Sequence, residues 1–172
     1  MKNTTWTLDN THSEIAFKVK HMMISTVTGH FEDFDASAKT EGDNFEDAHF
    51  EFTAKTASIN TKNKDRDTHL RSDDFFNSEE FPEMKFVSKS FKGDKIVGDL
   101  TIRDVTKEIT LDAELNGIAV DPYGQTKAGF EIRGEVNRKD FNLTWNAVTE
   151  AGSIVVSDKV KLVVDLQFTK QA

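Results

Sequence analysis

The chain of 172 residues contains no cysteine, only two prolines and no apolar run longer than three residues. Without cysteine it can have no disulfide bond, no thiolate nucleophile and no cysteine-ligated metal site. A membrane-spanning helix needs about 20 apolar residues and the core of a signal peptide about 7, so the sequence excludes both segments. With Met1 taken as the native start, we expect a cytoplasmic protein without an integral membrane segment.

Positive charge is also scarce. Lysine and arginine number 22 against 30 aspartates and glutamates, which gives a net charge of −8. This balance excludes nucleic-acid binding driven by overall positive charge, and we expect no nucleic-acid partner. The length is that of one domain spanning residues 1–172, long enough to bury an extensive core.

Motifs for catalysis and metal binding are missing as well. There is no GxSxG nucleophile elbow, and the nine glycines are scattered rather than gathered into a phosphate-binding loop. The five histidines have neither the spacing of a zinc-binding helix nor an alternate spacing along one strand. We therefore predict no catalytic residue and no metal site, and the alternative is an enzyme in which His69 or His21 acts as the acid–base group.

Alternation of apolar and polar residues is the strongest positive signal. Apolar side chains recur at every second position from Val160 to Phe168, with mostly polar residues between them. This pattern predicts a strand with one buried and one solvated face, as in an antiparallel sheet. The same alternation recurs at 15–19, 50–54, 84–86, 96–102, 109–115 and 128–136, and shorter strands are expected near 6–9 and across 29–40. We predict an all-β fold of eight or nine strands that closes as an antiparallel barrel, with a two-sheet sandwich as the alternative.

One polar stretch interrupts the strands and predicts a short helix over residues 63–74, anchored by Leu70 and Phe75. A turn is expected at residues 77–80. In this helix Arg66 and His69 share a face, and the arginine fork suits a phosphate or carboxylate group. The alternative is a solvated helix in which Arg66 pairs with a neighbouring aspartate.

The inward positions of the strands are rich in phenylalanine. The chain has 14 phenylalanines and one tyrosine, which would give an apolar interior suited to hydrocarbon rather than to sugar or nucleotide. Gly98 and Gly134 also fall on the apolar phase, where they would leave room for a ligand or mark a tight bend. The predicted cavity wall, for which ordinary core is the alternative, comprises Phe17, Val19, Phe50, Phe52, Phe86, Gly98, Leu100, Phe130, Ile132 and Gly134.

Several motifs in fixed order resemble those of the YceI-like family, the polyisoprenoid-binding proteins. Together they cover roughly residues 6–168, and the ordered set is more specific than any one motif. The segments that carry the resemblance are WTLDNTHSEIAF, VKHMMISTVTGHF, ASINT, RDTHLRSDDFF, FPEMKFVS, VGDLTIRDVTK, GFE and NRKDF. One position departs from the family pattern, because Asn142 stands where the family usually has glycine.

The resemblance implies a lipocalin-like, eight-stranded antiparallel barrel with a long apolar cavity. Such a cavity would hold an isoprenoid or a similar amphiphile with its polar head towards the mouth, and the chain would form a homodimer. The motif positions Arg66, Asp67, His69 and Arg138 carry over, and we expect Arg66, His69 and Arg138 to contact the ligand. Some of these side chains would alternatively staple the barrel.

We therefore predict non-catalytic binding of a lipid-like small molecule, with the bound amphiphile and no further cofactor, for storage, transport or sensing. Burial of each methylene group contributes about 0.8 kcal/mol, so a long chain needs no covalent or metal chemistry to bind. The alternatives are an enzyme that acts on an isoprenoid or lipid and a stress-linked interaction module with a filled barrel.

Overall fold

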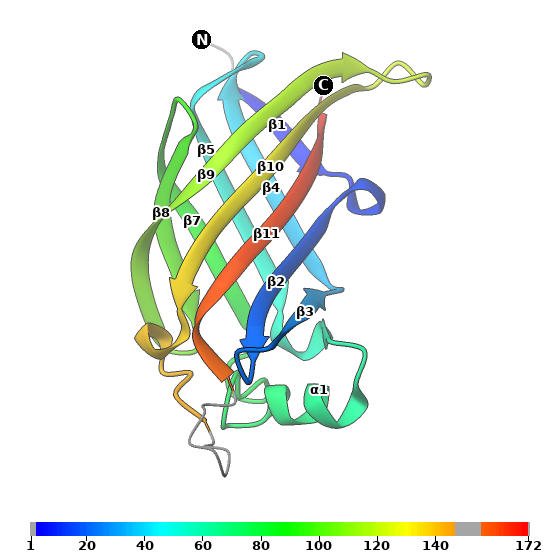
Figure 1. Ribbon diagram of the computed structural model, residues 1–172. Helices are drawn as coiled ribbons and strands as arrows, with labels where there is room; N and C mark the ends of the chain where they lie inside the picture. The colour runs from blue at the N-terminus through cyan, green and yellow to red at the C-terminus, as the bar shows by residue number, and fades with distance from the viewer. Residues whose placement is uncertain (1–2, 147–155, 172) are drawn as a thin grey trace.

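The computed structural model describes residues 3–146 and 156–171 and consists mainly of β-strands (Figure 1). The strands are β1 (Asn3–Leu8), β2 (Glu14–His21), β3 (Ser25–Phe31), β4 (Phe34–Glu41), β5 (Asn44–Lys55), β6 (Ile59–Asn60), β7 (Glu83–Lys92), β8 (Lys95–Ile102), β9 (Val105–Val120), β10 (Thr126–Asn137) and β11 (Val156–Lys170). Between β6 and β7 lies the helix α1 (Lys64–Arg71), and short 3₁₀ helices occur at η1 (Asn10–His12), η2 (Thr56–Ser58) and η3 (Arg138–Phe141).

Eight of these strands close into an antiparallel barrel in the order β1-β4-β5-β7-β8-β9-β10-β11, and β11 pairs back with β1. The register places apolar side chains opposite one another on the inner face, as in the pairs Phe130–Leu166 and Ile96–Leu111. The predicted eight-stranded, lipocalin-like barrel is therefore confirmed, and the alternative of two stacked sheets is wrong. Closure satisfies the backbone groups that an open sheet would leave at its edges.

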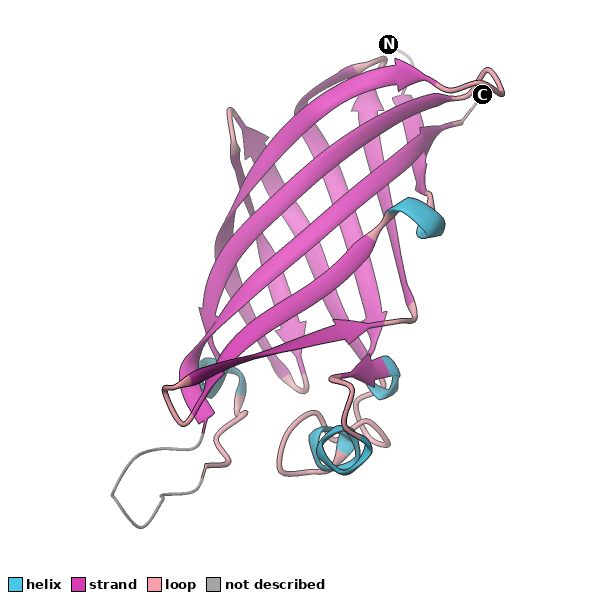
Figure 2. Ribbon diagram, turned by 45° about the vertical axis from the view of Figure 1, so that its right-hand side comes forward, coloured by secondary structure: helices cyan, strands magenta, loops and turns pink. Residues whose placement is uncertain are grey.

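The last strand changes partner along its length. The upper part of β11 pairs with β1, where Phe168 lies opposite Leu8, and the lower part pairs with β2, where Val160 lies opposite Val19. The following strand β3 pairs with β2 and with the two-residue β6, whereas β4 pairs with β1 and β5. The strands β2, β3 and β6 therefore diverge from the closed barrel at its lower end. We call this the open end, and α1 lies beside it (Figures 1 and 2).

A hydrogen-bonded corner around Asp9 separates β1 from β2. The Asp9 carboxylate accepts hydrogen bonds from Thr11 Oγ1 at 2.8 Å and Lys127 Nζ at 3.0 Å, and His12 Nδ1 lies 2.9 Å away. Burial acts to raise the pKa of Asp9, but these hydrogen bonds together with the charge of Lys127 lower it well below its usual range. The Ser13 hydroxyl completes the corner by donating to the Asp9 carbonyl at 2.8 Å.

The upper end of the barrel, where the β4–β5 and β7–β8 hairpins turn, is filled by aromatic rings. Phe130 lies 5.0 Å from Phe45 and 5.4 Å from Phe50, centroid to centroid, in edge-on contacts that favour ring pairs. We call this group the aromatic cluster, and its members are Trp6, Phe45, Phe50, Phe91, Phe130 and Phe168. Each member is at least 95 % buried, so this half of the barrel is solid.

The helix is shorter than the predicted span of residues 63–74. It begins after Asn63, whose side chain accepts a hydrogen bond from the Arg66 backbone N–H at 3.0 Å as an N-cap. It ends at Arg71 because Ser72 adopts an extended backbone and its hydroxyl bonds to the last turn. The expected anchors Leu70 and Phe75 do face the barrel interior, Phe75 from the turn that follows the helix.

We predict that Asp9→Asn destabilises the protein at neutral pH by about 2 kcal/mol, because the contacts of the carboxylate with Thr11, His12, Lys127 and Gln167 are weakened. A carboxyl whose pKa is lowered on folding stabilises the fold above its unfolded pKa, and this contribution disappears as the pH falls towards the folded value. The difference between wild type and Asp9→Asn should therefore shrink between about pH 5 and pH 2. Urea unfolding at pH 7 and at low pH measures it, and a difference that does not change with pH would contradict the role of Asp9.

Candidate functional site: an apolar cavity at the open end

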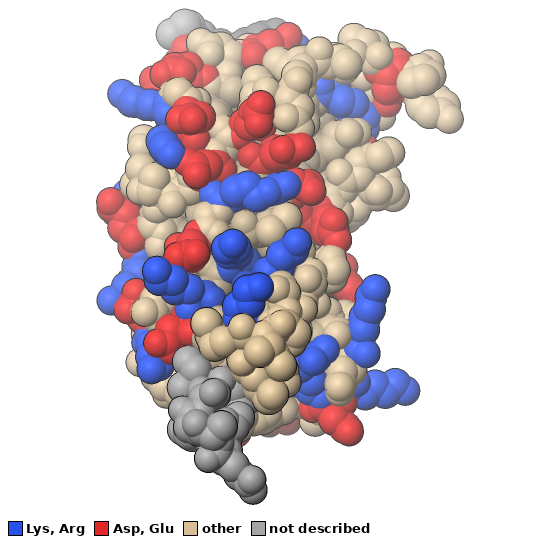
Figure 3. Space-filling view, in the orientation of Figure 1, with Lys and Arg blue, Asp and Glu red and all other residues tan. Residues whose placement is uncertain are grey.

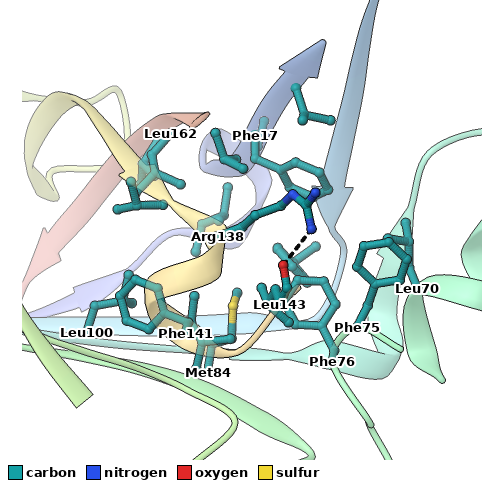
Figure 4. A pocket seen from close by; sticks show the side chains of 18 of the residues that line it. Phe17, Leu70, Phe75, Phe76, Met84, Leu100, Arg138, Phe141, Leu143 and Leu162 are labelled. Carbon is teal, nitrogen blue, oxygen red and sulfur yellow. Dashed lines mark hydrogen bonds between the residues drawn. The ribbon is translucent and has the colours of Figure 1, made fainter. Parts of the chain in front are cut away.

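An inner cavity of about 120 Å³ occupies the open half of the barrel, below the aromatic cluster. Figure 4 shows side chains that line it. Its wall is apolar except for Arg138, whose guanidinium is turned onto backbone carbonyls. Side chains from β2, β3, β5, β7, β8, β10 and β11 meet the segments around α1 and η3 there. The lining residues are Ile15, Ala16, Phe17, Val19, Phe31, Phe52, Leu70, Phe75, Phe76, Met84, Leu100, Ile102, Val136, Arg138, Phe141, Leu143, Val156, Val160, Leu162 and Val164.

A second space of about 430 Å³ adjoins the inner cavity and has a mixed polar and apolar wall. It lies between β2, β3, α1 and Trp145, and we call it the mouth. The two spaces share the lining residues Phe17, Val19, Leu70, Phe75 and Val156. The polar part of the mouth consists of Lys20, His21, Thr61, Asn63, Asp65, Arg66 and His69.

The structure brings seven of the thirteen predicted site residues to these two spaces. Phe17, Val19, Phe52, Leu100 and Arg138 line the inner cavity, and Arg66 and His69 line the mouth together with Phe17 and Val19. These inward-facing strand residues and the polar residues of α1 therefore lie in one region of the molecule.

Four predicted aromatic and aliphatic residues lie in the packed interior instead. Phe50 and Phe130 belong to the aromatic cluster, and Ile132 is buried on the same strand as Phe130. Phe86 is 99 % buried and stacks at 5.1 Å on Phe52, which itself lines the cavity. Alternation tells which face of a strand a residue occupies but not its height along the barrel. It therefore cannot distinguish residues that line the inner cavity from residues that fill the packed half of the barrel.

The two inward glycines do not leave room for a ligand. A Cβ atom at Gly98 would lie 2.6 Å from the Val87 carbonyl oxygen and 2.8 Å from Ser88 Cα, beside a bulge in the β7–β8 pairing. At Gly134 it would lie 2.2 Å from a methyl group of Leu111. The interpretation of these glycines as ligand space is corrected here, because neighbouring atoms already fill the volume above them.

The guanidinium of Arg138 ties two segments of backbone together. Nε donates to the Ser157 carbonyl at 2.9 Å, and Nη1 donates to the carbonyls of Leu143 and Trp145 at 2.5 and 2.8 Å. Nη2 donates to the Val156 carbonyl at 3.3 Å. Burial lowers the pKa of Arg138, and the nearby Asp158 opposes this shift. The group is therefore committed to holding the 143–145 segment against the start of β11, with its stem in the cavity wall.

The other motif residues of α1 are also tied to the protein. Asp67 accepts hydrogen bonds from the backbone N–H and the hydroxyl of Thr61, at 2.8 and 2.5 Å. Arg66 Nε donates to the same hydroxyl at 2.7 Å, and Arg66 Nη2 donates to the Thr61 carbonyl at 2.7 Å. The predicted alternative of an Arg66–aspartate pair is thus replaced by contacts to Thr61, which fix the helix to the end of β6.

His69 connects the helix to the segment after η3. Its Nε2 lies 2.8 Å from Asp74 Oδ2, and its ring packs edge-on against Trp145 at 4.6 Å and Phe75 at 5.1 Å. Two rings and one carboxylate therefore hold the imidazole at the rim of the mouth.

Sequence reasoning missed Arg103, which joins the loops at the open end. Its Nη1 donates to the carbonyls of Asp73, Phe75 and Asn142, and its guanidinium lies 5.7 Å from the centroid of the Phe81 ring. Arg103 stands inside the VGDLTIRDVTK motif, but periodicity gives no signal for a side chain that bonds to distant loop carbonyls.

Most of the remaining wall could have been found from the alternation itself. Val160, Leu162 and Val164 are the lower inward positions of the most regular strand, and all line the cavity. The residues from loops and η3, such as Phe76, Phe141 and Leu143, carry no comparable period.

Asn142 keeps the turn that glycine would make. Its φ of 62° and ψ of 20° lie in the left-handed region, which asparagine tolerates better than most residues. The departure from the family pattern therefore leaves the turn after η3 intact, with the Leu143 backbone N–H bonded to the Arg138 carbonyl at 3.1 Å.

Across the described residues, no group of three histidines or carboxylates is arranged to hold a metal ion. Nor does any helix in the same part of the chain combine the length and apolar composition needed to cross a membrane.

An eight-stranded antiparallel barrel that is filled at one end and hollow at the other defines a lipocalin-like architecture. The sequence model of the YceI-like domain matches residues 6–168, so the chain belongs to the YceI-like family, as its motifs suggest. It is 38 % identical over 167 residues to the UPF0312 protein of Staphylococcus aureus (strain MSSA476), covering 96 % of this chain and 98 % of that protein.

Solved structures share the fold. The YCEI protein of Campylobacter jejuni is 34 % identical with a TM-score of 0.76, over 89 % of this chain and 90 % of that one. A polyisoprenoid binding domain from Saccharophagus degradans has a TM-score of 0.74 over 96 % of this chain and 98 % of that one. At 15 % identity the second likeness shows the fold alone.

We predict that Arg138→Lys lowers the free energy of unfolding by about 2–4 kcal/mol, because an ammonium group cannot reach all the carbonyls that the guanidinium pairs. Guanidinium unfolding followed by tryptophan fluorescence measures the loss, and Trp145 should become more accessible to a quencher. The matched control is Arg133→Lys, at a side chain 43 % exposed, which should change stability by less than about 0.5 kcal/mol. Equal effects of the two variants would contradict the role of Arg138 in holding the 143–145 segment against β11.

We predict that Gly98→Ala destabilises the barrel by about 2–3 kcal/mol, because the added methyl group meets backbone atoms that cannot move aside. Gly129→Ala is the control, since no atom lies within 4 Å of its added Cβ, and its stability should be unchanged or slightly raised. Thermal unfolding of both variants decides whether Gly98 is a packing glycine; a neutral Gly98→Ala would restore the interpretation as free volume.

Proposed function

We propose that this protein binds a lipid-like amphiphile, an isoprenoid or a similar hydrocarbon chain, without chemical change. The observation that carries the proposal is the apolar inner cavity and its direct continuation into the polar-rimmed mouth. The Saccharophagus degradans domain with the same fold is a polyisoprenoid-binding domain, which supports a ligand of this class.

The volumes indicate how such a chain would be held. The inner cavity of about 120 Å³ is slightly smaller than a cavity known to hold one benzene molecule, whereas the mouth of about 430 Å³ is within the usual range for ligand pockets. A long chain would therefore place its end in the inner cavity and most of its length in the mouth. Each buried methylene group would contribute about 0.8 kcal/mol before the costs of ordering.

The rim of the mouth suits the polar end of the molecule. Lys20, His21, Asn63 and Asp65 are exposed there, so a head group beside them would remain in contact with water. Head-group binding then needs no buried charge, which would be costly to desolvate.

The arrangement favours binding over catalysis. Among the described residues that line the inner cavity, only Arg138 is ionisable, and its donors are committed to backbone carbonyls. His69 and His21 belong to the mouth, where a substrate's chain rather than a fixed reactive centre would pass. The homodimer and the cytoplasmic location stay predictions of the sequence.

The test is uptake of geranylgeraniol and palmitic acid, measured by native mass spectrometry and by titration. We predict that the wild type takes up one chain and that Val160→Phe weakens binding at least about tenfold, because the ring occupies the inner cavity. Val163→Phe is the matched control, since Val163 lies opposite Arg133 on the outer face of the same strand, and its binding should be unchanged.

Two results would count against the proposal. A wild type that takes up neither compound, and contains no lipid when purified from its own host, would favour the filled-barrel interpretation. Equal loss in Val160→Phe and Val163→Phe would show that the effect arises from strand disruption rather than from filling the cavity.

A further inference from the structure

The β2–β3 hairpin exposes large apolar side chains at its tip, next to the mouth. Met22, Met23 and Ile24 are 36, 60 and 79 % exposed, and they form the turn between the paired residues His21 and Ser25. Three adjacent exposed apolar residues of this size are unusual on a protein surface. Exposed apolar patches are typical of sites that contact another protein or a membrane. We call these three residues the hairpin tip.

The turn does not need these residues for its own geometry. Met22 and Met23 are the central residues of a β-turn that the Ile24 backbone N–H closes on the His21 carbonyl at 3.2 Å, and their φ angles of 52° and 59° lie in the left-handed region. Asparagine and glycine adopt this region at little cost, whereas a methionine pays a steric penalty of roughly 1–2 kcal/mol. The methionines are therefore unfavourable for the local fold, which does not account for their exposed apolar surface.

A lysine-lined groove lies on the outer face of the barrel beside the hairpin tip. Its volume is about 680 Å³, and it is lined by Met23, by Glu135 and Asp158, and by four lysines, Lys18, Lys20, Lys159 and Lys161. Figure 3 shows basic side chains gathered over the middle and lower part of this face and acidic ones over its upper part. The chain as a whole is acidic, so this local excess of positive charge is a distinct feature of the open end.

Some of these lysines have no carboxylate partner within the described residues. Lys159 lies 3.7 Å from Glu135, and Asp158 is paired with Lys139 at 3.3 Å. By contrast, no described carboxylate lies within ion-pair distance of Lys18 or Lys161, although these two lysines face each other directly across the β2–β11 pair. Like charges that face each other directly are destabilising, and Glu135, which lies opposite Lys161 across the β10–β11 pair, is the carboxylate that already pairs with Lys159.

We propose that the hairpin tip and the lysine groove dock this protein on the surface of an anionic lipid bilayer. The apolar tip would enter the interface between head groups and acyl chains, and the lysines would lie against the anionic head groups. Charge complementarity is the reason for choosing a lipid surface: the groove is positive, and the tip is apolar and projects beyond it.

The docking face lies next to the entrance of the cavity, which suggests how docking would serve ligand exchange. Val19 and Lys20 line both the groove and the mouth, so one short stretch of β2 separates them. A protein docked through the hairpin tip would hold its mouth next to the bilayer, where an amphiphile could pass between membrane and cavity. This role in ligand exchange rests on the proposed function, whereas the docking itself does not depend on what fills the cavity.

The experiment is cosedimentation of the full chain with phosphatidylcholine vesicles that contain phosphatidylglycerol, compared with phosphatidylcholine alone. We expect binding to the anionic vesicles only, decreasing as salt is raised to about 0.5 M because the lysines are screened. The double variant Met23→Ser/Ile24→Ser should lower the partition coefficient at least about tenfold. Lys18→Gln/Lys161→Gln should lower it about fivefold for each lysine that reaches the surface.

Matched controls lie at the other end of the barrel. Val120 and Tyr123, at the end of β9 and in the turn that follows it, are 68 and 89 % exposed, so Val120→Ser/Tyr123→Ser removes similar apolar surface away from the mouth. Lys39→Gln/Lys92→Gln makes the same change in net charge with exposed lysines of β4 and β7. Both control variants should bind anionic vesicles as the wild type does.

Three outcomes would overturn the proposal. The first is no binding of the wild type to anionic vesicles at low salt, and the second is equal loss of binding in the tip variant and its control. The third is a concentration-dependent dimer in analytical ultracentrifugation that Met23→Ser/Ile24→Ser abolishes, with no vesicle binding, which would assign the hairpin tip to contact between two copies. Uptake of geranylgeraniol is measured separately without vesicles, so failure of docking and failure of the proposed function are distinguishable.

Discussion

The hydrogen-bonded corner around Asp9 separates two strands that share one partner, and the shape of the barrel depends on it. β11 pairs with β1 above the corner and with β2 below it. A carboxylate with four polar partners, Thr11, His12, Lys127 and Gln167, can be withdrawn from water at this point. Hydrogen bonds from the first three and the charge of Lys127 lower the pKa of Asp9 because they favour its charged form. Because the chain turns here, β3 follows β2 away from β4 and pairs with β6 instead. The opening that results is the place where α1 and the loops can approach the interior.

The interior of the barrel is packed differently above and below this corner. In the upper half, rings from β1, β5, β7, β10 and β11 meet at the axis and fill it, as an eight-stranded barrel allows. In the lower half the inward residues are mostly aliphatic, and smaller side chains such as Val160 and Val164 leave the inner cavity between them. The filled barrel and the ligand-binding barrel are thus not exclusive interpretations of this sequence. The solid half supplies stability, which lets the other half remain hollow.

The fold could be predicted from the sequence much further than the site. Period-two alternation is a local property, and it identified the strands because each has one face in contact with the core. Closure followed from the need to satisfy strand edges. The site depends on height along the barrel, which a period of two does not encode, so Phe52 could not be separated from its neighbour Phe50. The polar residues were harder still, because Arg103 and Arg138 bond to carbonyls of segments that only the tertiary structure brings near.

The commitment of these polar side chains to the protein itself constrains how a ligand would be selected. Arg138, Arg66 and Asp67 hold the loops and the helix that form the wall, so in the proposed function they act on the ligand through the shape of the cavity. A guanidinium that satisfies buried carbonyls can remain in an apolar wall, whereas an unpaired one would attract water into it. In the proposed function the wall would then discriminate by the length and branching of the hydrocarbon chain. The head group would stay at the solvent-exposed rim, where contacts with exposed lysine and histidine are weak. In the proposed function, selection would therefore rest on the hydrocarbon chain, and the head group would add little to the affinity.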